Sequence, residues 1–311
     1  MNKDTMVSEL IGRLGSKRTP NIARIASEIR ISAGLSLRKK GFVELNPVIF
    51  SPLTDPLHHK TLDGTIQYLD HRFYITRSMI FHKQISLIAL EKIFIFSPNV
   101  RLEPAEYAKT GRHLLEFTQI DVEMKNASRE EVMEIAEQMF VDILTHIRNY
   151  CTAELEMLDR KLSIPQKPFT RIKYREAYRK YGKEFEKQIS CEAKEPFWII
   201  DIPIEAREFY DREYEEEPGI LCDMDMVYPE GFGEALSGGE REYRFERILE
   251  RVRHYDANPE DFWWYLELAK TGLPRCAGFG IGVERLTRYI CGLNHVSEAT
   301  LFPKVPGAYS I

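Results

Sequence analysis

Hydrophobic and polar residues alternate along two stretches near the middle of the chain, residues 93–97 and 115–124. Both stretches are rich in β-branched and aromatic residues, and this pattern predicts β-strands with one buried face. The segment between them is polar. We therefore expect two antiparallel strands that are joined by a long loop.

A spacing of three or four residues between apolar positions predicts two long amphipathic helices. The first extends over residues 19–40, with Thr19 as its cap and Pro20 in the first helical position. The second opens on the capping-box sequence of residues 128–131 and continues to residue 147. Both apolar faces are expected to pack in the core.

Weaker patterns fill the rest of the chain. Residues 151–195 are charged and contain Pro165 and Pro168, so we expect two helical pieces there and identify no chemistry in them. The other predictions are an edge strand at 41–47, a loop at 48–70, a strand at 72–76, a buried helix at 77–92, a buried strand at 196–203 and a glycine-rich strand entering a helix at 278–293.

Composition narrows the class of protein. The apolar fraction of 43% and charged fraction of 29% are those of an ordinary globular protein. A formal charge of −5 gives no general attraction to nucleic acid, although it leaves room for a local basic patch. The five cysteines form no CxxC pair, which disfavours a disulfide framework or a zinc site and favours the cytoplasm. No stretch approaches about 18 consecutive apolar residues, so we expect no membrane partner.

The polar loop between the two central strands carries Arg101, Glu103, Arg112 and His113. Arginine and histidine side chains are donors suited to phosphate oxygens. Phe117 on the returning strand offers an aromatic face on which a purine can stack. On spacing alone, a solvated loop with salt bridges explains these residues equally well.

The sequences NVRLE and GRHLLEFTQIDVEM within residues 93–124 resemble motif 2 of the class II aminoacyl-tRNA synthetases, in the aspartyl and asparaginyl branch. The resemblance implies an α+β fold, in which helices flank an antiparallel β-sheet. It also implies that Arg101 binds the α-phosphate and the substrate carboxylate. The remaining ATP-binding residues implied by motif 2 are Glu103 on the adenine side, Arg112 and His113 at the outer phosphates, Leu114, and Phe117 stacked on adenine.

The other two motifs of the family have counterparts in the expected order. Residues 24–47, ending in Pro47, resemble motif 1, which forms the dimer interface in the family and implies a homodimer. Residues 276–292 resemble motif 3. There the resemblance implies that Gly282 and Glu284 contact ATP and that Arg285 binds the γ-phosphate.

The resemblance also implies an amino-acid site and a metal site. Lys83 and Arg241 stand where aspartyl enzymes bind a substrate carboxylate, and asparaginyl enzymes lack this lysine. A lysine that extends from a helix to solvent is the alternative for Lys83. The further aspartate-binding residues would be Asp55, in place of a family glutamate, Ser78, Arg101 and Ser237. Asp225, Glu234 and Ser237 would bind Mg²⁺ beside the phosphates of ATP.

We expect residues 19–311 to form the catalytic domain and residues 1–18 an extension. Residues 1–18 are too few for the OB-fold barrel with which the family reads the anticodon. The sequence therefore favours an ammonia-dependent asparagine synthetase that activates aspartate with ATP and Mg²⁺, and tRNA is not expected as a partner. An aspartate or asparagine tRNA ligase, a ligase with another acceptor and a non-catalytic paralogue are the alternatives. Which carboxylate of aspartate is activated stays open.

Overall fold

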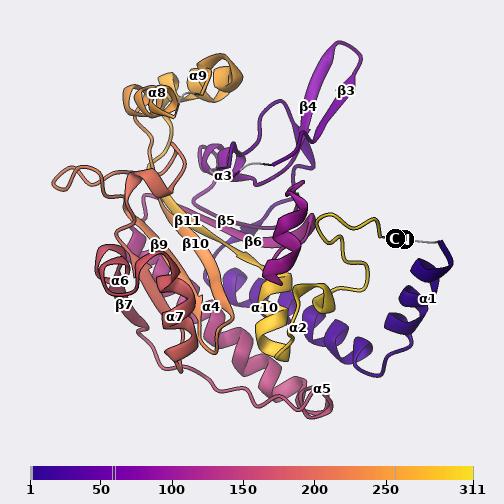
Figure 1. Ribbon diagram of the computed structural model, residues 1–311. Helices are drawn as coiled ribbons and strands as arrows, with labels where there is room; N and C mark the ends of the chain where they lie inside the picture. The colour runs from indigo at the N-terminus through magenta and orange to yellow at the C-terminus, as the bar shows by residue number, and fades with distance from the viewer. Residues whose placement is uncertain (1–2, 58, 60, 256, 311) are drawn as a thin grey trace.

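The computed structural model describes residues 3–57, 59, 61–255 and 257–310. Its centre is a large sheet that contains eight strands among the described residues (Figure 1). Neighbouring strands are antiparallel except at the two edges, where the outermost strands pair in parallel. In spatial order the strands are β1 (Val43–Glu44), β5 (Lys92–Val100), β6 (Glu116–Lys125), β11 (Cys276–Gly282), β10 (Gly233–Arg241), β9 (Asp223–Tyr228), β8 (Phe197–Ile200) and β7 (Thr170–Lys173).

Two long helices and one shorter helix cover one face of this sheet (Figure 1). They are α2 (Thr19–Lys39), α4 (Arg129–Tyr150) and α10 (Val283–Cys291). Their apolar faces meet the sheet in the main hydrophobic core, where Ile29 of α2, Ile143 of α4 and Phe279 of β11 are fully buried. The predicted amphipathic stripes are therefore core-facing, and the α+β prediction is confirmed.

The predicted capping box of α4 is present. The Ser128 hydroxyl accepts a hydrogen bond from the Glu131 N–H at 3.3 Å, and the Ser128 N–H donates to the Glu131 carboxylate at 2.8 Å. The predicted cap of α2 is wrong. Thr19 already lies inside that helix, and its hydroxyl donates to the carbonyl of Arg13 at 2.7 Å because the preceding chain folds back as a turn.

The opposite side of the sheet carries smaller elements. A three-stranded sheet consists of β2 (Phe50–Ser51), β4 (His71–Ile75) and β3 (Thr65–Tyr68). Strands β3 and β4 extend away from the body as a hairpin (Figure 1). Helices α3 (Ile80–Ser86), α8 (Phe245–His254) and α9 (Trp263–Gly272) pack around a second apolar cluster. The remaining helices are α1 (Lys3–Leu14), α5 (Thr152–Met157), α6 (Tyr174–Tyr181), α7 (Phe185–Glu192) and the short 3₁₀ helices η1 (Ala105–Thr110), η2 (Gly182–Glu184), η3 (Ile204–Ala206), η4 (Pro259–Phe262) and η5 (Val296–Ala299).

Three local predictions were wrong. Residues 48–70 form two short strands rather than loop alone, because they pair with β4. The helix expected at 77–92 is only α3, since buried Leu87 packs with Ile93 and Ile95 in a turn that leads into β5. The segment 151–195 contains β7, which gains its strand conformation from parallel pairing with β8. No helix of the described part of the chain is long and apolar enough to cross a membrane.

Candidate active site

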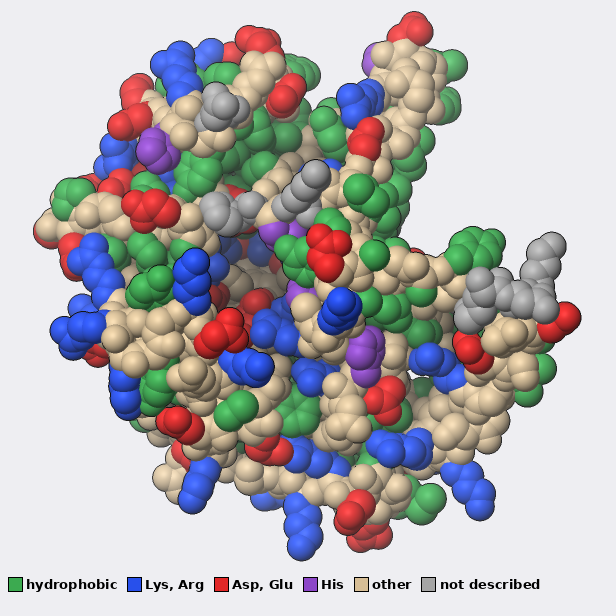
Figure 2. All heavy atoms as spheres, viewed as in Figure 1, with side chains coloured by type: hydrophobic (Ala, Val, Ile, Leu, Met, Phe, Trp, Pro, Cys, Tyr) green, Lys and Arg blue, Asp and Glu red, His purple; other side chains and the backbone are tan. Residues whose placement is uncertain are grey.

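A cavity of about 330 Å³ lies over the central strands, on the side of the sheet opposite to the core that α2 and α4 cover. The space-filling view shows it as a hollow with both blue cationic and red anionic side chains on its walls (Figure 2). The predicted site residues converge here although they come from distant parts of the chain. Those that line it are Asp55, Ser78, Lys83, Arg101, Glu103, Arg112, His113, Leu114, Phe117, Glu234, Ser237, Arg241, Gly282, Glu284 and Arg285. Asp225 is not among the lining residues, and it lies beside Ser237 on the neighbouring strand.

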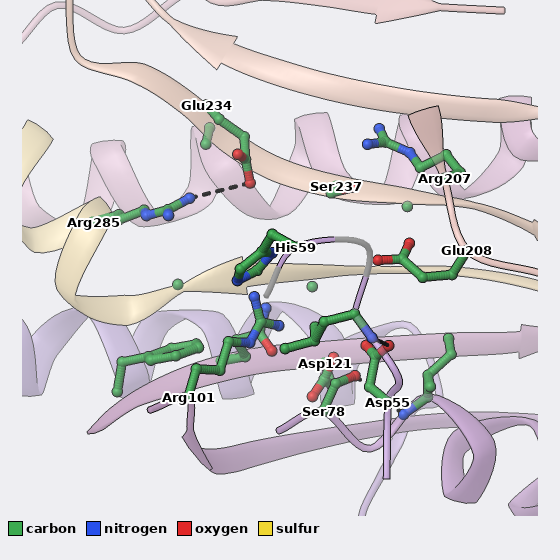
Figure 3. A pocket seen from close by; sticks show the side chains of 18 of the residues that line it. Asp55, His59, Ser78, Arg101, Asp121, Arg207, Glu208, Glu234, Ser237 and Arg285 are labelled. Atoms are coloured by element: carbon green, nitrogen blue, oxygen red, sulfur yellow. Dashed lines mark hydrogen bonds and ion pairs between the residues drawn. The ribbon is translucent and has the colours of Figure 1, made fainter. Parts of the chain in front are cut away.

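One end of the cavity is dominated by arginines that contact Glu234. Arg285 contacts one carboxylate oxygen of Glu234 at 3.1 Å (Figure 3). Arg112 approaches the other oxygen at 3.4 Å. Burial alone would raise the pKa of Glu234, but Arg285, Arg112 and two further arginines lower it to about 2. The Arg285 Nε also donates to the backbone carbonyl of Arg112 at 3.1 Å, which restrains the Arg285 side chain. This end presents guanidinium donors in the geometry that binds phosphate oxygens.

Arg101 and Phe117 are neighbours in the same cavity. The Arg101 guanidinium lies over the Phe117 ring at 5.2 Å from its centre, a cation–π contact. The Arg101 Nε donates to the carbonyl of Arg77 at 3.1 Å. The aromatic face that we expect to stack on a purine is thus partly covered by the arginine expected to bind phosphate.

His113 lies beside Glu103 but carries no charge at neutral pH. Burial and the neighbouring Arg285 lower the pKa of His113 to about 4. Its Nε2 is 3.8 Å from Glu103, and its Nδ1 is 2.6 Å from the Thr110 hydroxyl. His113 can therefore contribute a hydrogen bond at the phosphate end, while the positive charge there comes from arginines.

Glu103 has a second histidine neighbour, which the sequence analysis did not place in the site. The His59 Nε2 is 3.1 Å from a Glu103 carboxylate oxygen, and His59 lies across the cavity (Figure 3). The other oxygen of Glu103 is buried without a hydrogen-bond partner among the described residues. A buried carboxylate oxygen at the wall of a cavity is an acceptor that a ligand N–H group can satisfy.

The other end of the cavity contains a buried ionic network around Lys83 and Arg241. The Lys83 ammonium contacts Asp121 at 2.9 Å and Glu123 at 3.5 Å. The Arg241 guanidinium contacts Glu123 at 3.1 Å and Asp211 at 2.7 Å. Lys83 is only 3% exposed, so the alternative of a lysine reaching to solvent is wrong. The carboxylate partners are residues that the sequence analysis missed.

Asp55 is buried at the same end, where its carboxylate points into the cavity opposite Glu208 (Figure 3). It accepts hydrogen bonds from the Leu57 N–H at 3.1 Å and from the Tyr210 hydroxyl at 3.2 Å. Burial and the nearby Glu208 raise the pKa of Asp55 to about 6. Glu208 and its neighbour Arg207 also line the cavity, and the sequence carried no signal for either residue.

The predicted metal ligands lie together on β9 and β10. Asp225 and Ser237 are partners in the strand ladder, and Arg207 contacts Asp225 at 2.5 Å. Burial raises the pKa of Asp225, and the negative charge of Glu234 raises it further. No cluster of three metal-binding side chains occurs among the residues that the structure describes. Asp225 and Glu234 on neighbouring strands nevertheless fit Mg²⁺, which is usually bound by one or two carboxylates together with substrate phosphates.

Glycines on β10 and β11 let the cavity reach the backbone of the sheet. A Cβ atom on Gly280 would come within 3.0 Å of Asp121 and within 3.1 Å of the Gln119 side chain. Gly238 is more restricted still, since its Cβ atom would meet the carbonyl of Gly278 at 2.2 Å. Both glycines line the cavity, so its floor is flat backbone that a ligand can approach closely.

Known proteins that are similar to this chain belong to the family whose motifs the sequence resembles. The profile of the class II tRNA synthetases (D, K and N) matches residues 2–306. The asparagine–tRNA ligase of Lactobacillus delbrueckii is 30% identical over 314 residues, covering 94% of this chain and 70% of that protein. The corresponding ligase of Pyrococcus abyssi is 28% identical over 307 residues, covering 94% and 70%.

Two solved structures have the same fold. Asparaginyl-tRNA synthetase from Pyrococcus horikoshii, complexed with asparaginyl-adenylate, superposes with a TM-score of 0.90 at 25% identity and covers all of this chain and 74% of its own. The enzyme from Entamoeba histolytica, also with asparaginyl-adenylate, gives 0.87 at 22% identity, with coverage of 100% and 74%.

Proposed function

The chain belongs to the class II tRNA synthetases (D, K and N), and from this premise we propose that it activates aspartate with ATP as aspartyl-adenylate. The observation that carries the choice of aspartate is the pair of buried cations at one end of the cavity, Lys83 and Arg241. ATP would occupy the opposite end, where Arg112 and Arg285 lie.

The two cations retain donors for a substrate. A lysine ammonium has three N–H donors, of which Asp121 engages one on Lys83, while a Glu123 oxygen lies 3.5 Å away. A guanidinium has five, and the described partners of Arg241 engage three. Both residues line the cavity, where their remaining donors would suit a carboxylate. Both oxygens of a carboxylate can accept from these cations, whereas the amide of asparagine offers them only one acceptor and no negative charge, so aspartate is the better fit.

The reaction needs charge neutralisation more than acid–base catalysis. A carboxylate oxygen of aspartate attacks the α-phosphorus of ATP, the bond to the leaving pyrophosphate breaks, and no proton has to move. Arg101 would stabilise charge at the α-phosphate, and Arg285 charge at the leaving group. Mg²⁺, held by Asp225 and Glu234 with Ser237 beside them, would supply further positive charge at the phosphates when bound.

The acceptor of the activated aspartate is the second part of the proposal. The relatives are named as asparagine–tRNA ligases, which supports tRNA as the acceptor and gives no support to the expectation that tRNA is not a partner. Ammonia is a second candidate. It is favoured by the carboxylates of Asp55 and Glu208, which point into the cavity and can attract ammonium.

Product analysis separates these acceptors. The protein is incubated with Mg-ATP and labelled aspartate, together with ammonium alone, with tRNA alone, or with neither. Free labelled asparagine in the first mixture identifies an asparagine synthetase, whereas label bound to tRNA in the second identifies a tRNA ligase. Absence of pyrophosphate release from ATP in every mixture would contradict aspartate activation itself.

Two further parts of the proposal concern the oligomeric state and the cellular location of the protein. We propose a homodimer through α2 and β1, where Ile31, Leu35 and Val43 leave about half of each side chain exposed. Apolar side chains exposed near one another are typical of a protein–protein interface. We also propose that the enzyme acts in the cytoplasm.

A further inference from the structure

Glu186 reaches the phosphate end of the cavity from a segment to which the sequence assigned no chemistry. It lies in the first turn of α7, and its carboxylate oxygen Oε1 has two partners. That oxygen accepts from the Arg112 Nη1 at 3.0 Å and from the backbone N–H of Glu234, also at 3.0 Å. Glu186 does not line the cavity, so it can act only through these two residues.

The close approach of Glu186 depends on a glycine. Gly233 precedes Glu234 and has a φ of +76°, which side chains rarely adopt. A Cβ atom at this position would come within 2.7 Å of the Arg112 Nη1 and within 3.1 Å of the Glu186 Oε1. The absence of a side chain at residue 233 thus lets the helix, the arginine and the strand meet.

Helix α7 is fixed against the strands that carry the predicted metal ligands. The buried Ser190 hydroxyl donates to the carbonyl of Tyr228 at 2.7 Å and accepts from the Gly233 N–H at 3.0 Å. The Ser190 carbonyl accepts from the Gly231 N–H at 3.0 Å. Three hydrogen bonds from one residue hold the helix on the turn between β9 and β10, so Glu186 has a defined position.

We propose that Glu186 is a positioning residue that orients Arg112 toward the triphosphate of ATP and keeps Glu234 available for Mg²⁺. Arg112 is held by its Nη1 on Glu186, while its Nη2 approaches Glu234 at 3.4 Å. When ATP binds, the Nη2 edge turns from Glu234 to a phosphate, and the Nη1 contact is kept. This inference rests on the proposed binding of Mg-ATP in the cavity.

Removing the charge of Glu186 should change how the Arg112 guanidinium divides its contacts between Glu186 and Glu234. Without that anion, Glu234 becomes the principal carboxylate near Arg112, and the two side chains can form a bidentate pair. Mg²⁺ then has to compete with a guanidinium for Glu234. The variant E186Q retains the length of the side chain and an acceptor for the Glu234 N–H, so it tests the charge alone.

The test is steady-state kinetics of aspartate-dependent ATP–pyrophosphate exchange for E186Q, together with calorimetric titration of ATP with and without Mg²⁺. We expect the KM for Mg-ATP to rise about tenfold, with kcat within about twofold and the KM for aspartate unchanged. Calorimetry should show a loss of ATP affinity that is larger with Mg²⁺ than without it. A merely structural helix contact would not produce this pattern.

The matched control is E192Q on the same helix, because the exposed Glu192 contacts only the Tyr181 hydroxyl among its described partners. It should leave all these values unchanged. An unchanged KM and ATP affinity for E186Q, or a fall in kcat alone, would overturn the role of Glu186. If E186Q loses its native circular dichroism, E186D is measured instead, since a shorter side chain cannot reach both partners. An unchanged KM and ATP affinity for E186D would overturn the role equally.

Failure of the proposed function can be distinguished from failure of the role proposed for Glu186. If the wild-type protein shows no exchange with aspartate, the assignment of the amino acid is wrong, and calorimetry with Mg-ATP still decides the role of Glu186.

Discussion

The ammonium group of Lys83 lies 2.9 Å from Oδ1 of Asp121, and both side chains are almost completely buried. A buried charge is costly unless it is paired, and this pair offsets the charge of Lys83 while leaving further N–H donors of its ammonium group for a substrate. The second oxygen of Asp121 is buried without a hydrogen-bond partner among the described residues. The amino-acid end of the cavity is therefore an ionic network that is already formed, to which a substrate carboxylate adds one more anion.

Because Lys83 is paired with buried carboxylates, its substitution should lower the stability of the fold as well as the affinity for substrate. Lys83→Met leaves Asp121 and Glu123 buried without their shared cation, and we expect a loss of about 3–5 kcal/mol in the free energy of unfolding. We also expect aspartate affinity to fall far more than ATP affinity. Urea denaturation measures the first effect and calorimetry the second.

A double variant separates binding from folding. Lys83→Met with Asp121→Asn removes both charges, so it should recover part of the lost stability. If this variant folds and still binds aspartate with the wild-type affinity, Lys83 has no part in recognising the substrate.

The arginines at the phosphate end should be essential for activation. Arg101→Ala and Arg285→Ala each remove charge-assisted contacts that strengthen as the α-phosphorus becomes pentavalent. We expect kcat for ATP–pyrophosphate exchange to fall by two or more orders of magnitude, or about 3 kcal/mol in the transition state. Arg175→Ala is the control, because Arg175 on α6 is largely exposed and pairs only weakly with Glu217 at 3.4 Å. Near wild-type exchange in either site variant would refute the assignment of that arginine.

Asp55 should make both stability and substrate binding depend on pH. Its pKa is about 6 in the folded protein and near 4 in the unfolded chain, so folding favours the protonated carboxyl. The stability that it contributes is complete below about pH 4 and is lost as the pH rises to about 6. Asp55→Asn should therefore stabilise the protein at pH 8, by an amount on the order of 2 kcal/mol, and much less at pH 4.

The same substitution should weaken the binding of aspartate at pH 8, because it removes an anion that can attract the substrate ammonium. Thermal unfolding at the two pH values and a calorimetric titration measure the two effects. A variant that is equally stabilised at pH 4 and pH 8 would show that the charge of Asp55 is not the cause.

Local patterns in the sequence were sufficient to predict the strands and helices whose apolar residues recur at a regular spacing. The hairpin of β5 and β6 and the helices α2 and α4 follow directly from alternation and helical spacing. The edge strand β7 could not be predicted in this way, because its conformation depends on pairing with β8, a contact that no local pattern encodes. The shortened α3 has a similar cause, since tertiary packing of Leu87 overrides helical propensity.

The candidate site likewise contains residues that the sequence could place there and residues that it could not. Residues that belong to a resembling motif, such as Arg101 and Arg285, could be placed in the cavity from the sequence. Glu208 and Glu186 could not, because each reaches the site from a segment without a motif, through contacts that only the folded chain creates. The neutral state of His113 was also beyond the sequence, since it results from burial and from the nearby Arg285.

Aspartate-dependent exchange of labelled pyrophosphate into ATP tests the central claim most directly, because it requires adenylate formation and no acceptor. The measurement is made with the wild-type protein, Mg-ATP and either aspartate or asparagine. We predict rapid exchange with aspartate and at least about tenfold slower exchange with asparagine, because the free donors of Lys83 and Arg241 favour a carboxylate. Exchange that requires asparagine, or no exchange with either amino acid, would contradict the claim that this site activates aspartate.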